Sequence, residues 1–293
     1  TGCQAVLVAL HKLDAEKFEK MPKSVKCISR LGVGLDSIDL VAAKAHHMPV
    51  IFQPTYAYNE VANHAISMIM ALHRGLFQAN KSTQEGNWIP APKTAEVISL
   101  QDSSLGVIGC GRIGKNFIEK MRPFVKEVVG YDPGVTTPIE GVRMVTNLDD
   151  LLTTCKVISM HAPYMPSTHH MISEKELAKM QKGSILVNVS RGGLIDENAL
   201  VQALESGHLD GAGLDVYEKE PAINPKLIRL AEEGKVVLLP HMGSATVETR
   251  NAMGFKALDN LEAFLLRGQT LPDLAWQQAS LQLIDVHERR GAG

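Results

Sequence analysis

The feature that most constrains the fold of this chain is a regular alternation of short apolar runs with amphipathic stretches between about residues 105 and 240. The runs are rich in Val and Ile and have the length of strands that are buried on both faces of a parallel sheet. Their expected ranges are Leu105–Gly109, Val128–Asp132, Val157–Ala162, Ile185–Val189, Gly211–Tyr217 and Val236–Pro240. Strands joined by helical crossovers in this way predict an α/β domain with a doubly wound parallel sheet.

The clearest helix between these strands is expected at Asp196–Glu205. Asp196 is suited to cap its N-terminus, because a carboxylate there accepts hydrogen bonds from free backbone N–H groups. Leu200 and Leu204 lie on one face, and Gly207 follows just beyond the end, where glycine commonly terminates helices. This crossover therefore carries its own start and stop signals.

A glycine-rich turn follows the first strand of the series and opens a helix. It consists of Gly109, Cys110, Gly111, Arg112, Ile113 and Gly114. Glycines permit the tight turn and let the backbone approach a pyrophosphate, whose charge then lies at the positive end of the helix. The next strand ends at Asp132, where a carboxylate accepts both ribose hydroxyls and repels a 2′-phosphate. We therefore predict a Rossmann dinucleotide domain that binds NAD rather than NADP, with a plain turn residue before Pro133 as the alternative role of Asp132.

Four further segments stand in the order that they have in a known family. They are Arg30–Asp36 (RLGVGLD), Val189–Gly193 (VSRGG), Gly211–Pro221 (GAGLDVYEKEP) and Pro240–Ala245 (PHMGSA). With these segments the chain resembles the D-isomer-specific 2-hydroxyacid dehydrogenase family from about position 3 to about position 270. The resemblance implies hydride transfer between NAD(H) and a small 2-hydroxy or 2-keto acid, of the kind of glyoxylate, hydroxypyruvate or 3-phosphoglycerate.

Three residues suit this chemistry. Arg191 is the expected carboxylate anchor, because a guanidinium can hold a carboxylate and a keto oxygen together. His241 is the expected acid and base, because imidazole titrates near the working pH. Glu220 would orient His241 and keep a proton ready for reduction of the ketone. All three stand at or after the carboxyl ends of expected strands, where open α/β sheets form their sites.

The resemblance adds further binding residues. Val33 and Gly34, in the glycine loop near the start, would donate backbone N–H groups to the substrate carboxylate. Besides the glycine turn and Asp132, the residues expected to contact the cofactor are Ala162, Pro163, Val189, Ser190, Arg191, Asp215, His241 and Gly243.

The first part of the chain repeats the α/β alternation on a smaller scale. Its expected elements are the strands Ala5–Ala9, Lys26–Arg30 and Val50–Gln53, the helices Ala15–Lys20 and Ile38–Ala45, and a long helix at Asn59–Arg74. We expect residues 1–77 to form a smaller, flavodoxin-like substrate domain and residues 78–254 the NAD-binding domain. Residues 255–293 would return as a C-terminal helix and tail. Most relatives carry another strand and helix before the position of Thr1, so the substrate domain is expected without its first strand and helix.

Other interpretations of the same residues stay open. Taken singly, Arg191 could be a surface cation, His241 a turn residue and Glu220 a solvated charge. The chain also resembles the C-terminal-binding corepressors, NAD(H)-dependent interaction proteins that share this fold and keep these three residues. Phosphite oxidation is a further alternative. Formate oxidation is disfavoured, because formate enzymes carry Gln at the position of Glu220.

The amino-acid composition limits the classes of partner that this chain is expected to bind. A formal net charge of −2 provides no large basic field for nucleic acid or an anionic membrane, and no apolar run approaches the roughly 18 residues of a membrane span. Cys3, Cys27, Cys110 and Cys155 lack metal spacing, so we expect no metal site and thiols of a cytoplasmic protein. The apolar face of the long helix, extended by Leu76 and Phe77, predicts a homodimer through the dinucleotide domains.

Overall fold

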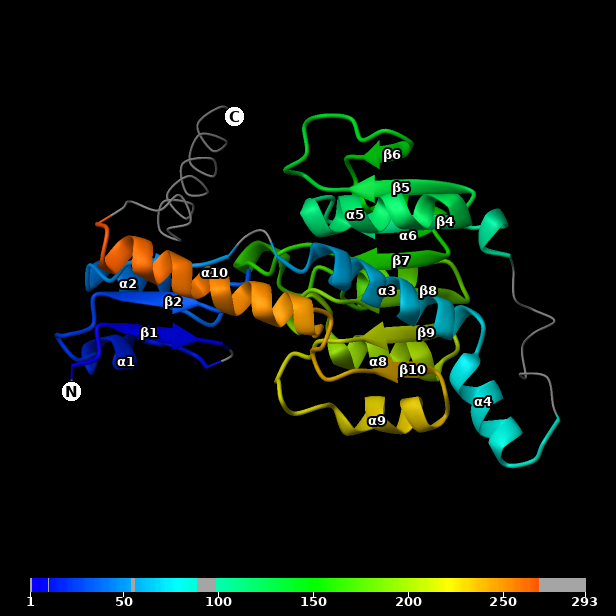
Figure 1. Cartoon of the computed structure of the whole chain (residues 1–293). Coiled ribbons are helices and arrows are strands. Elements are labelled where there is room, and N and C mark those ends of the chain that lie inside the picture. The colour runs from blue at the N-terminus through cyan, green and yellow to red at the C-terminus, as the bar shows by residue number, and fades with distance from the viewer. Residues whose placement is uncertain (1, 10, 54–55, 89–98, 269–293) are drawn as a thin grey trace. The chain divides into compact units, whose positions relative to one another are not determined.

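The computed structural model describes residues 2–9, 11–53, 56–88 and 99–268. It divides into two compact units, one of Thr1–Ala57 with Ala245–Gly293 and the other of Tyr58–Ser244 (Figure 1). Each unit contains a parallel sheet with helices, which confirms the predicted α/β class.

The larger unit is organised around a seven-stranded sheet in the order β10-β9-β8-β7-β4-β5-β6, and every neighbouring pair is parallel. Its strands are β4 (Ser104–Ile108), β5 (Glu127–Tyr131), β6 (Val142–Val145), β7 (Val157–Met160), β8 (Ser184–Asn188), β9 (Leu209–Leu214) and β10 (Val236–Leu238). The strand order reverses between β4 and β7, because β5 and β6 continue to one side and β8 to β10 to the other. In doubly wound sheets the ligand lies at the carboxyl ends of the strands beside this reversal.

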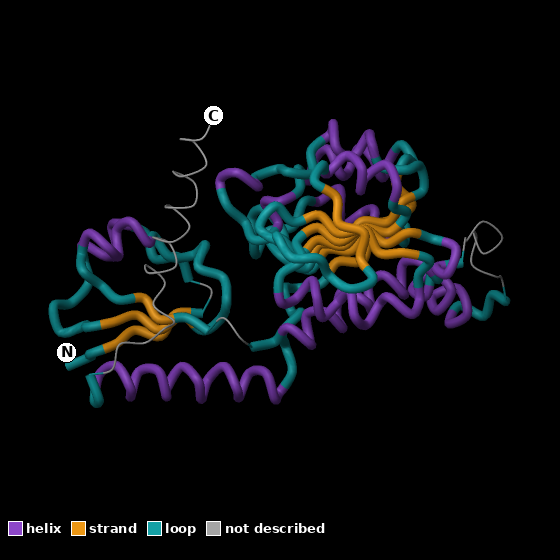
Figure 2. Tube along the Cα trace, turned by 90° about the horizontal axis from the view of Figure 1, so that it is seen from above, coloured by secondary structure: helices purple, strands orange, loops and turns teal. Residues whose placement is uncertain are grey.

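Helices cover both faces of this sheet, as Figure 2 shows. The covering helices are α3 (Tyr58–His73), α5 (Arg112–Met121), α6 (Leu148–Thr154), α7 (Glu174–Lys179), α8 (Glu197–Glu205) and α9 (Pro225–Glu232). A further helix, α4 (Leu76–Gln84), has no buried residue and extends beyond the sheet (Figure 1). One apolar core contains the buried residues of α3 and α5, such as Ile69 and Phe117. The other contains those of α6 to α9, such as Leu151, Leu200 and Leu227. The sheet is therefore buried on both sides, as its apolar strands predict.

The expected cap of α8 is confirmed. Asp196 has extended backbone, and its Oδ1 accepts hydrogen bonds from the N–H groups of Asn198 (2.9 Å) and Ala199 (3.1 Å). Leu200 and Leu204 are fully buried on the inner face of the helix. Local signals were therefore sufficient to define this element.

Two features of the larger unit differ from the expectation. Strand β6 was not predicted: it is short, incompletely buried and paired on one side only, so its residues lack the continuous apolar run of an inner strand. The strands β7, β9 and β10 also end earlier than expected. Val216 and Tyr217 are buried although they follow β9, because the chain packs inward after it leaves the ladder.

The smaller unit has a three-stranded parallel sheet in the order β1-β2-β3. Its elements are β1 (Ala5–Val8), α1 (Ala15–Glu19), β2 (Cys27–Arg30), α2 (Leu40–Ala45), β3 (Val50–Ile51) and α10 (Val247–Leu265). Helix α10 packs onto this sheet, where Leu261 joins Cys27 and Ile51 in a small buried cluster.

The larger unit also contains short 3-10 helices, at Leu100–Asp102, Arg122–Phe124, Pro166–Thr168 and Gly192–Leu194.

The two units change at Ala57/Tyr58 and at Ser244/Ala245, whereas the sequence suggested boundaries after residues 77 and 254. The first boundary differs because α3 buries Ala62, Ala65, Met68 and Ile69 in the core of the larger unit.

The tail after residue 268 lies outside the described residues. Within the part of the chain that is described, no helix combines the length and hydropathy required to cross a bilayer.

Candidate active site

The glycine turn after β4 is shaped by two close backbone approaches. Gly109 has a φ of +91°, and a Cβ there would lie 2.4 Å from the backbone nitrogen of Ala162. A Cβ on Gly114 would lie 2.1 Å from the carbonyl oxygen of Gly109. Neither position can hold a side chain, because the turn packs directly against the loop after β7 and the first turn of α5.

Gly111 is a glycine for a different reason. It precedes α5 with a φ of −73°, and a Cβ there would meet nothing within 4 Å. Glycine has no side chain that could cap α5, so the position in front of the helix N-terminus is left open. An anion fits this position, because the room left by Gly111 lies at the positive end of a helix. The residues present therefore fit a dinucleotide pyrophosphate.

Asp132 stands beside this turn at the end of β5. Its Oδ2 accepts a hydrogen bond from the N–H of Cys110 (2.8 Å), and its Oδ1 accepts one from the N–H of Gly134 (2.8 Å). The carboxylate is thereby fixed against the glycine turn. Each oxygen keeps a second lone pair, so the group can still accept hydrogen bonds from a ligand.

The other predicted cofactor residues follow the neighbouring strands. Ala162 and Pro163 come after β7, and Val189 and Ser190 come after β8. The Ser190 hydroxyl donates to the carbonyl oxygen of Met160 (3.0 Å), which joins the two loops. These residues therefore lie at the carboxyl edge of the sheet on the β7 side of the strand-order reversal, whereas the glycine turn and Asp132 lie on the β4 side.

His161, next to these loops, is half-buried. Its Nε2 lies 2.9 Å from Ser159 Oγ, and its ring packs against Phe117 with centroids 4.7 Å apart. Its Nδ1 is buried without a hydrogen-bond partner among the described residues. Burial lowers the pKa of His161 to about 3, so the ring is neutral at physiological pH.

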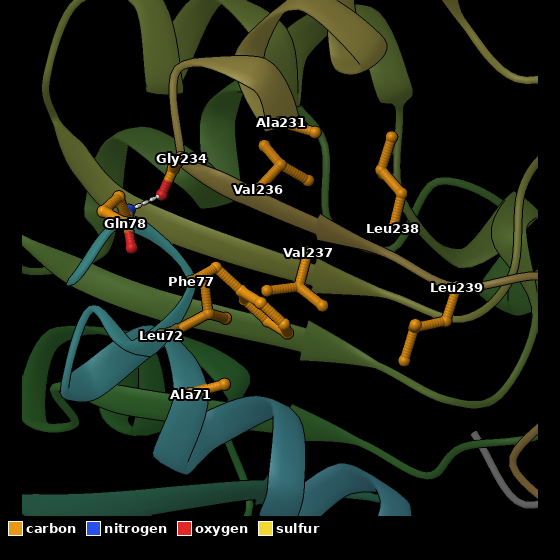
Figure 3. A pocket seen from close by; sticks show the side chains of 10 residues that line it. All are labelled: Ala71, Leu72, Phe77, Gln78, Ala231, Gly234, Val236, Val237, Leu238 and Leu239. Carbon is orange, nitrogen blue, oxygen red and sulfur yellow. Dashed lines mark hydrogen bonds between the residues drawn. The ribbon is translucent and has the colours of Figure 1, made fainter. Parts of the chain in front are cut away.

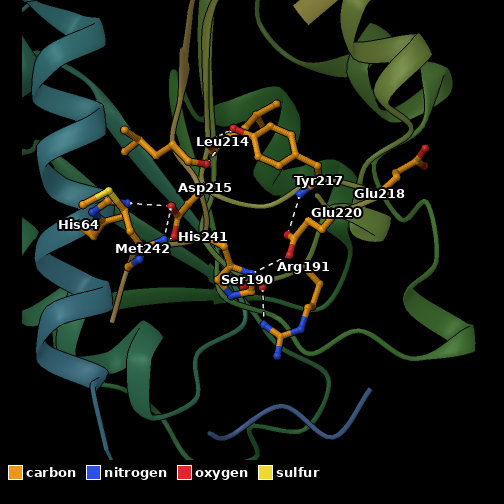
Figure 4. A network of polar contacts seen from close by, with 12 residues as sticks. His64, Ser190, Arg191, Leu214, Asp215, Tyr217, Glu218, Glu220, His241 and Met242 are labelled. Carbon is orange, nitrogen blue, oxygen red and sulfur yellow. Dashed lines mark hydrogen bonds and ion pairs between the residues drawn. The ribbon is translucent and has the colours of Figure 1, made fainter. Parts of the chain in front are cut away.

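Arg191 follows β8, and both its backbone and its side chain make hydrogen bonds to neighbouring residues. The Asn188 side-chain amide donates to the Arg191 carbonyl oxygen (2.8 Å), and the guanidinium Nη1 donates to the Ser190 carbonyl oxygen (2.7 Å). Figure 4 shows Arg191 in the same group of side chains as Glu220 and His241. The structure thus brings the three predicted catalytic residues together from the ends of three neighbouring strands.

Glu220 links the segment after β9 to the turn after β10. Its Oε1 accepts the Tyr217 N–H (3.0 Å), and its Oε2 lies 2.8 Å from His241 Nδ1 (Figure 4). Burial raises the pKa of Glu220, but the hydrogen bonds from His241 and Tyr217 and the charges of His241 and Arg191 outweigh it. The net pKa lies below its ordinary value, so Glu220 is a carboxylate that accepts the Nδ1 hydrogen of His241.

The His241 turn is held by Asp215, which follows β9 and is 1% exposed. One Asp215 oxygen accepts the Met242 N–H and the other the Gly243 N–H, both at 2.8 Å. His241 itself has a φ of +52°, an unusual conformation for a side chain other than glycine. His64 Nε2, from α3, lies 3.2 Å from Asp215 Oδ1. The carboxylate therefore fixes the turn from which His241 projects.

Val33 and Gly34 belong to the smaller unit, in the loop after β2. The Gly34 carbonyl oxygen accepts a hydrogen bond from Arg30 Nε (2.9 Å), and Val33 is 40% exposed. The loop is thus braced by a buried arginine of its own unit.

The sequence pattern described as "D-isomer specific 2-hydroxyacid dehydrogenase, NAD binding domain" matches residues 66–243, more than half of the chain. The chain belongs to the D-isomer-specific 2-hydroxyacid dehydrogenase family. Within this family, the D-3-phosphoglycerate dehydrogenase of Mycobacterium tuberculosis is 36% identical over 264 residues, which are 89% of this chain and 48% of the relative. The glyoxylate reductase of Thermococcus litoralis is 35% identical over 281 residues, 92% of this chain and 82% of the relative.

A solved member of the family has a similar structure. The D-lactate dehydrogenase from Aquifex aeolicus, complexed with NAD and lactic acid, has a TM-score of 0.83 at 31% identity, covering 90% of this chain and 83% of that chain. The present chain spans about half the length (48%) of several phosphoglycerate dehydrogenases that it matches, the Mycobacterium tuberculosis enzyme among them.

Two parts of this family member's polar network were missed by sequence reasoning. The resemblance had assigned Asp215 to the nicotinamide side of the cofactor, but its bonds to the His241 turn have no local signal. His64 was not given a role. The available signal was its position four residues before the buried Met68, which places a polar side chain on the inner side of α3.

A separate apolar pocket of about 320 Å³ lies in the same unit (Figure 3). Its lining residues are Ala71, Leu72, Phe77, Gln78, Ala231, Gly234, Val236, Val237, Leu238 and Leu239. The Gln78 side chain donates to the Gly234 carbonyl oxygen at one end. No predicted site residue lines this pocket, so it is distinct from the candidate active site.

Proposed function

We propose that this chain is an NAD-dependent oxidoreductase that interconverts a small D-2-hydroxy acid and the corresponding 2-keto acid. The observation that carries the proposal is the grouping of Arg191 with the bonded pair Glu220–His241 at the carboxyl edge that also holds the glycine turn. An anion anchor, a proton-exchanging group and a nucleotide cradle are the parts that this reaction requires.

NAD is held, in this proposal, by the glycine turn and Asp132. The open space over Gly111 and the N-terminus of α5 receive the pyrophosphate, while Asp132 accepts hydrogen bonds from the ribose. Ala162, Pro163, Val189 and Ser190 border the cofactor. When bound, NAD supplies or accepts the hydride.

The protein residues supply binding and proton transfer. Arg191 binds the substrate carboxylate and orients the C2 oxygen. Because Glu220 accepts the Nδ1 hydrogen of His241, the other ring nitrogen, Nε2, exchanges a proton with that oxygen. His241 donates the proton in ketone reduction and accepts it in alcohol oxidation, while Glu220 stabilises the charged ring. We also propose, from the family resemblance, that Val33 and Gly34 donate backbone N–H groups to the substrate carboxylate.

The substrate class follows from the same anchor. One carboxylate bound by Arg191 and one oxygen reached by His241 define a 2-hydroxy or 2-keto acid, and the related phosphoglycerate dehydrogenase, glyoxylate reductase and D-lactate dehydrogenase favour small members. We propose glyoxylate, hydroxypyruvate or 3-phosphoglycerate-like acids. A panel of glyoxylate, hydroxypyruvate, pyruvate, phenylpyruvate and 3-phosphohydroxypyruvate, assayed by NADH absorbance, distinguishes them.

The decisive variant is His241→Ala. We expect it to lower kcat by about 10²- to 10⁴-fold, the usual contribution of a positioned acid, while the NADH dissociation constant changes little. If the variant retains more than about a tenth of the kcat of the wild type, His241 is not the acid. Binding of NADH with no turnover of any acid in the panel would instead favour a corepressor-like interaction protein.

We also propose a homodimer formed by the larger units. The apolar face of α3 is used within the chain, since Ala62 and Ile69 are fully buried and Ile66 and Met70 pack against the core. The case for pairing therefore depends on Leu76 and Phe77 at the start of α4, which are 52% and 57% exposed.

The cysteines are unpaired thiols, which supports a cytoplasmic location.

A further inference from the structure

His170 contacts two loops that carry catalytic candidates. It follows the 3-10 helix Pro166–Thr168 and has a φ of +49°, a conformation that is uncommon for histidine. Its backbone N–H donates to the Gly193 carbonyl oxygen (2.8 Å). Its ring nitrogen Nε2 pairs with Glu218 Oε1. The backbone conformation thus allows one residue to hold two separate segments.

Each of the two contacts lies two residues along the chain from a catalytic candidate. Gly193 comes two residues after Arg191, and Glu218 comes two residues before Glu220. His170 therefore bridges the Arg191 loop and the Glu220 segment. A change in either contact would alter the spacing between the guanidinium and the carboxylate that orients His241.

The two bridged segments also touch directly. A Cβ on Gly192 would lie 1.9 Å from the carbonyl carbon of Tyr217, so the two backbones are in contact. The Glu218 N–H donates to Glu197 Oε1 (2.8 Å), which ties the same segment to α8. Because backbone meets backbone here, a displacement of one segment is passed to the other rather than absorbed by a flexible side chain.

The His170 ring has ionisable neighbours. The His169 ring stacks on it with centroids 3.9 Å apart, and the Tyr164 hydroxyl lies 3.2 Å from His169 Nδ1. Glu218, in the segment after β9, pairs with the ring, and its backbone N–H donates to Glu197 of α8. Burial, together with the charge of Glu218, raises the pKa of Glu197. A hydrogen-bond donor on Glu218 offsets part of the repulsion between these two carboxylates.

We propose that His170 is a positioning residue for the proposed reaction: its pair with Glu218 and its bond to Gly193 set the spacing between Arg191 and the Glu220–His241 pair. It touches neither substrate nor cofactor in this role. The inference rests on the proposed function, and its tests include one measurement that needs no turnover.

The first test compares three single variants and one double variant. His170→Asn keeps a residue that tolerates positive φ but is too short to reach Glu218, whereas His170→Gln can still place an amide donor there. We expect His170→Asn to lower kcat about tenfold or more, with NADH affinity within about twofold of the wild type, and His170→Gln to restore most of the loss. His47→Asn is the control, because His47 is exposed and has a φ of +50°. Adding Glu218→Gln to His170→Asn should cause little further loss.

The second test follows the His241 ring by NMR, with its resonance assigned from its loss in His241→Ala. We expect His170→Asn and Glu218→Gln to shift the His241 Cε1–H resonance, and His47→Asn to leave it in place. An unshifted resonance would overturn the inference even in a protein that turns over none of the acids. Equal losses of kcat, NADH affinity and thermal stability would overturn it as well, because they would indicate general unfolding. Absence of turnover in the wild type counts only against the proposed function.

Discussion

At the scale of single residues, two carboxylates of the candidate site each accept hydrogen bonds from the backbone of a neighbouring turn. Asp132 binds the N–H groups of Cys110 and Gly134, and Asp215 binds those of Met242 and Gly243. Replacing either residue with an apolar one would therefore disturb a turn as well as remove a charge. Asparagine is the informative substitution, because it keeps the shape and one acceptor oxygen while it removes the charge.

Asp132→Asn tests the preference for NAD over NADP. We expect the wild type to favour NADH, because the carboxylate repels the 2′-phosphate of NADPH. In the variant the ratio of kcat/KM for NADH to that for NADPH should fall by about tenfold or more. Asp150→Asn, at an exposed position of α6, is the control. Equal use of both cofactors by the wild type would contradict the assignment of Asp132.

His161 predicts a dependence of stability on pH. Its folded pKa of about 3 lies below the unfolded value of about 6.5, so between these limits the unfolded chain binds a proton that the folded chain excludes. The free energy of unfolding should therefore fall as the pH drops from about 6.5 towards about 3, by at most about 1.4 kcal/mol per pH unit from this residue. Urea denaturation of the wild type and of His161→Gln measures the difference. Parallel curves for the two proteins would show that the ring does not titrate in this way.

At the scale of elements, the loops that follow neighbouring strands are tied to one another. The short helix Gly192–Leu194 packs on the segment after β9, and Glu220 from that segment binds the turn after β10. The positions of the catalytic candidates thus depend on contacts between loops. We expect a substitution that forces two of these backbones apart to affect stability and activity together.

Gly192→Ala tests this arrangement. The added Cβ would lie 1.9 Å from Tyr217 backbone, so the two loops must separate. We expect a loss of about 1–3 kcal/mol in the free energy of unfolding, as for overpacked cores, together with a lower kcat. Gly254→Ala in α10 is the matched control: its Cβ meets nothing within 4 Å, and alanine should stabilise a helix by about 0.5–1 kcal/mol. Equal stability of the two variants would show that the loops are not packed as described.

At the scale of the whole molecule, assembly remains a prediction that rests on a small apolar surface. Leu76 and Phe77 are exposed beside the apolar pocket of Figure 3, and Phe77 is one of its lining residues. Sedimentation should report a mass near twice the chain mass of 31.9 kDa. Phe77→Glu should yield the monomer, because a charge would be buried without a partner. Phe124→Glu, at another exposed phenylalanine of the same unit, should remain dimeric. A monomeric wild type at micromolar concentration would refute the pairing.

The elements of this chain were largely predictable because their signals are local. The apolar runs of β4, β5, β7 and β8 match their observed strands to within two residues, and the cap at Asp196 defines α8. The glycine turn was recognisable for the same reason, since Gly109 and Gly114 are required by contacts made within a single strand–turn–helix unit and its neighbouring loop. Strand β6 was not predicted from the sequence, because an edge strand needs no continuous apolar run.

By itself, the sequence determined the alternation of strands and helices, the nucleotide turn and the identity of Arg191, Glu220 and His241 as candidates, because each depends on a few consecutive residues or on a family pattern. Only the tertiary structure decided which loops meet. The bonds from Asp215 to the His241 turn and from His170 to Gly193 and Glu218 join segments that are distant in the chain. The physical reason is that hydrophobic patterning states which face of an element is buried, whereas polar contacts between loops follow from the order in which the strands pack.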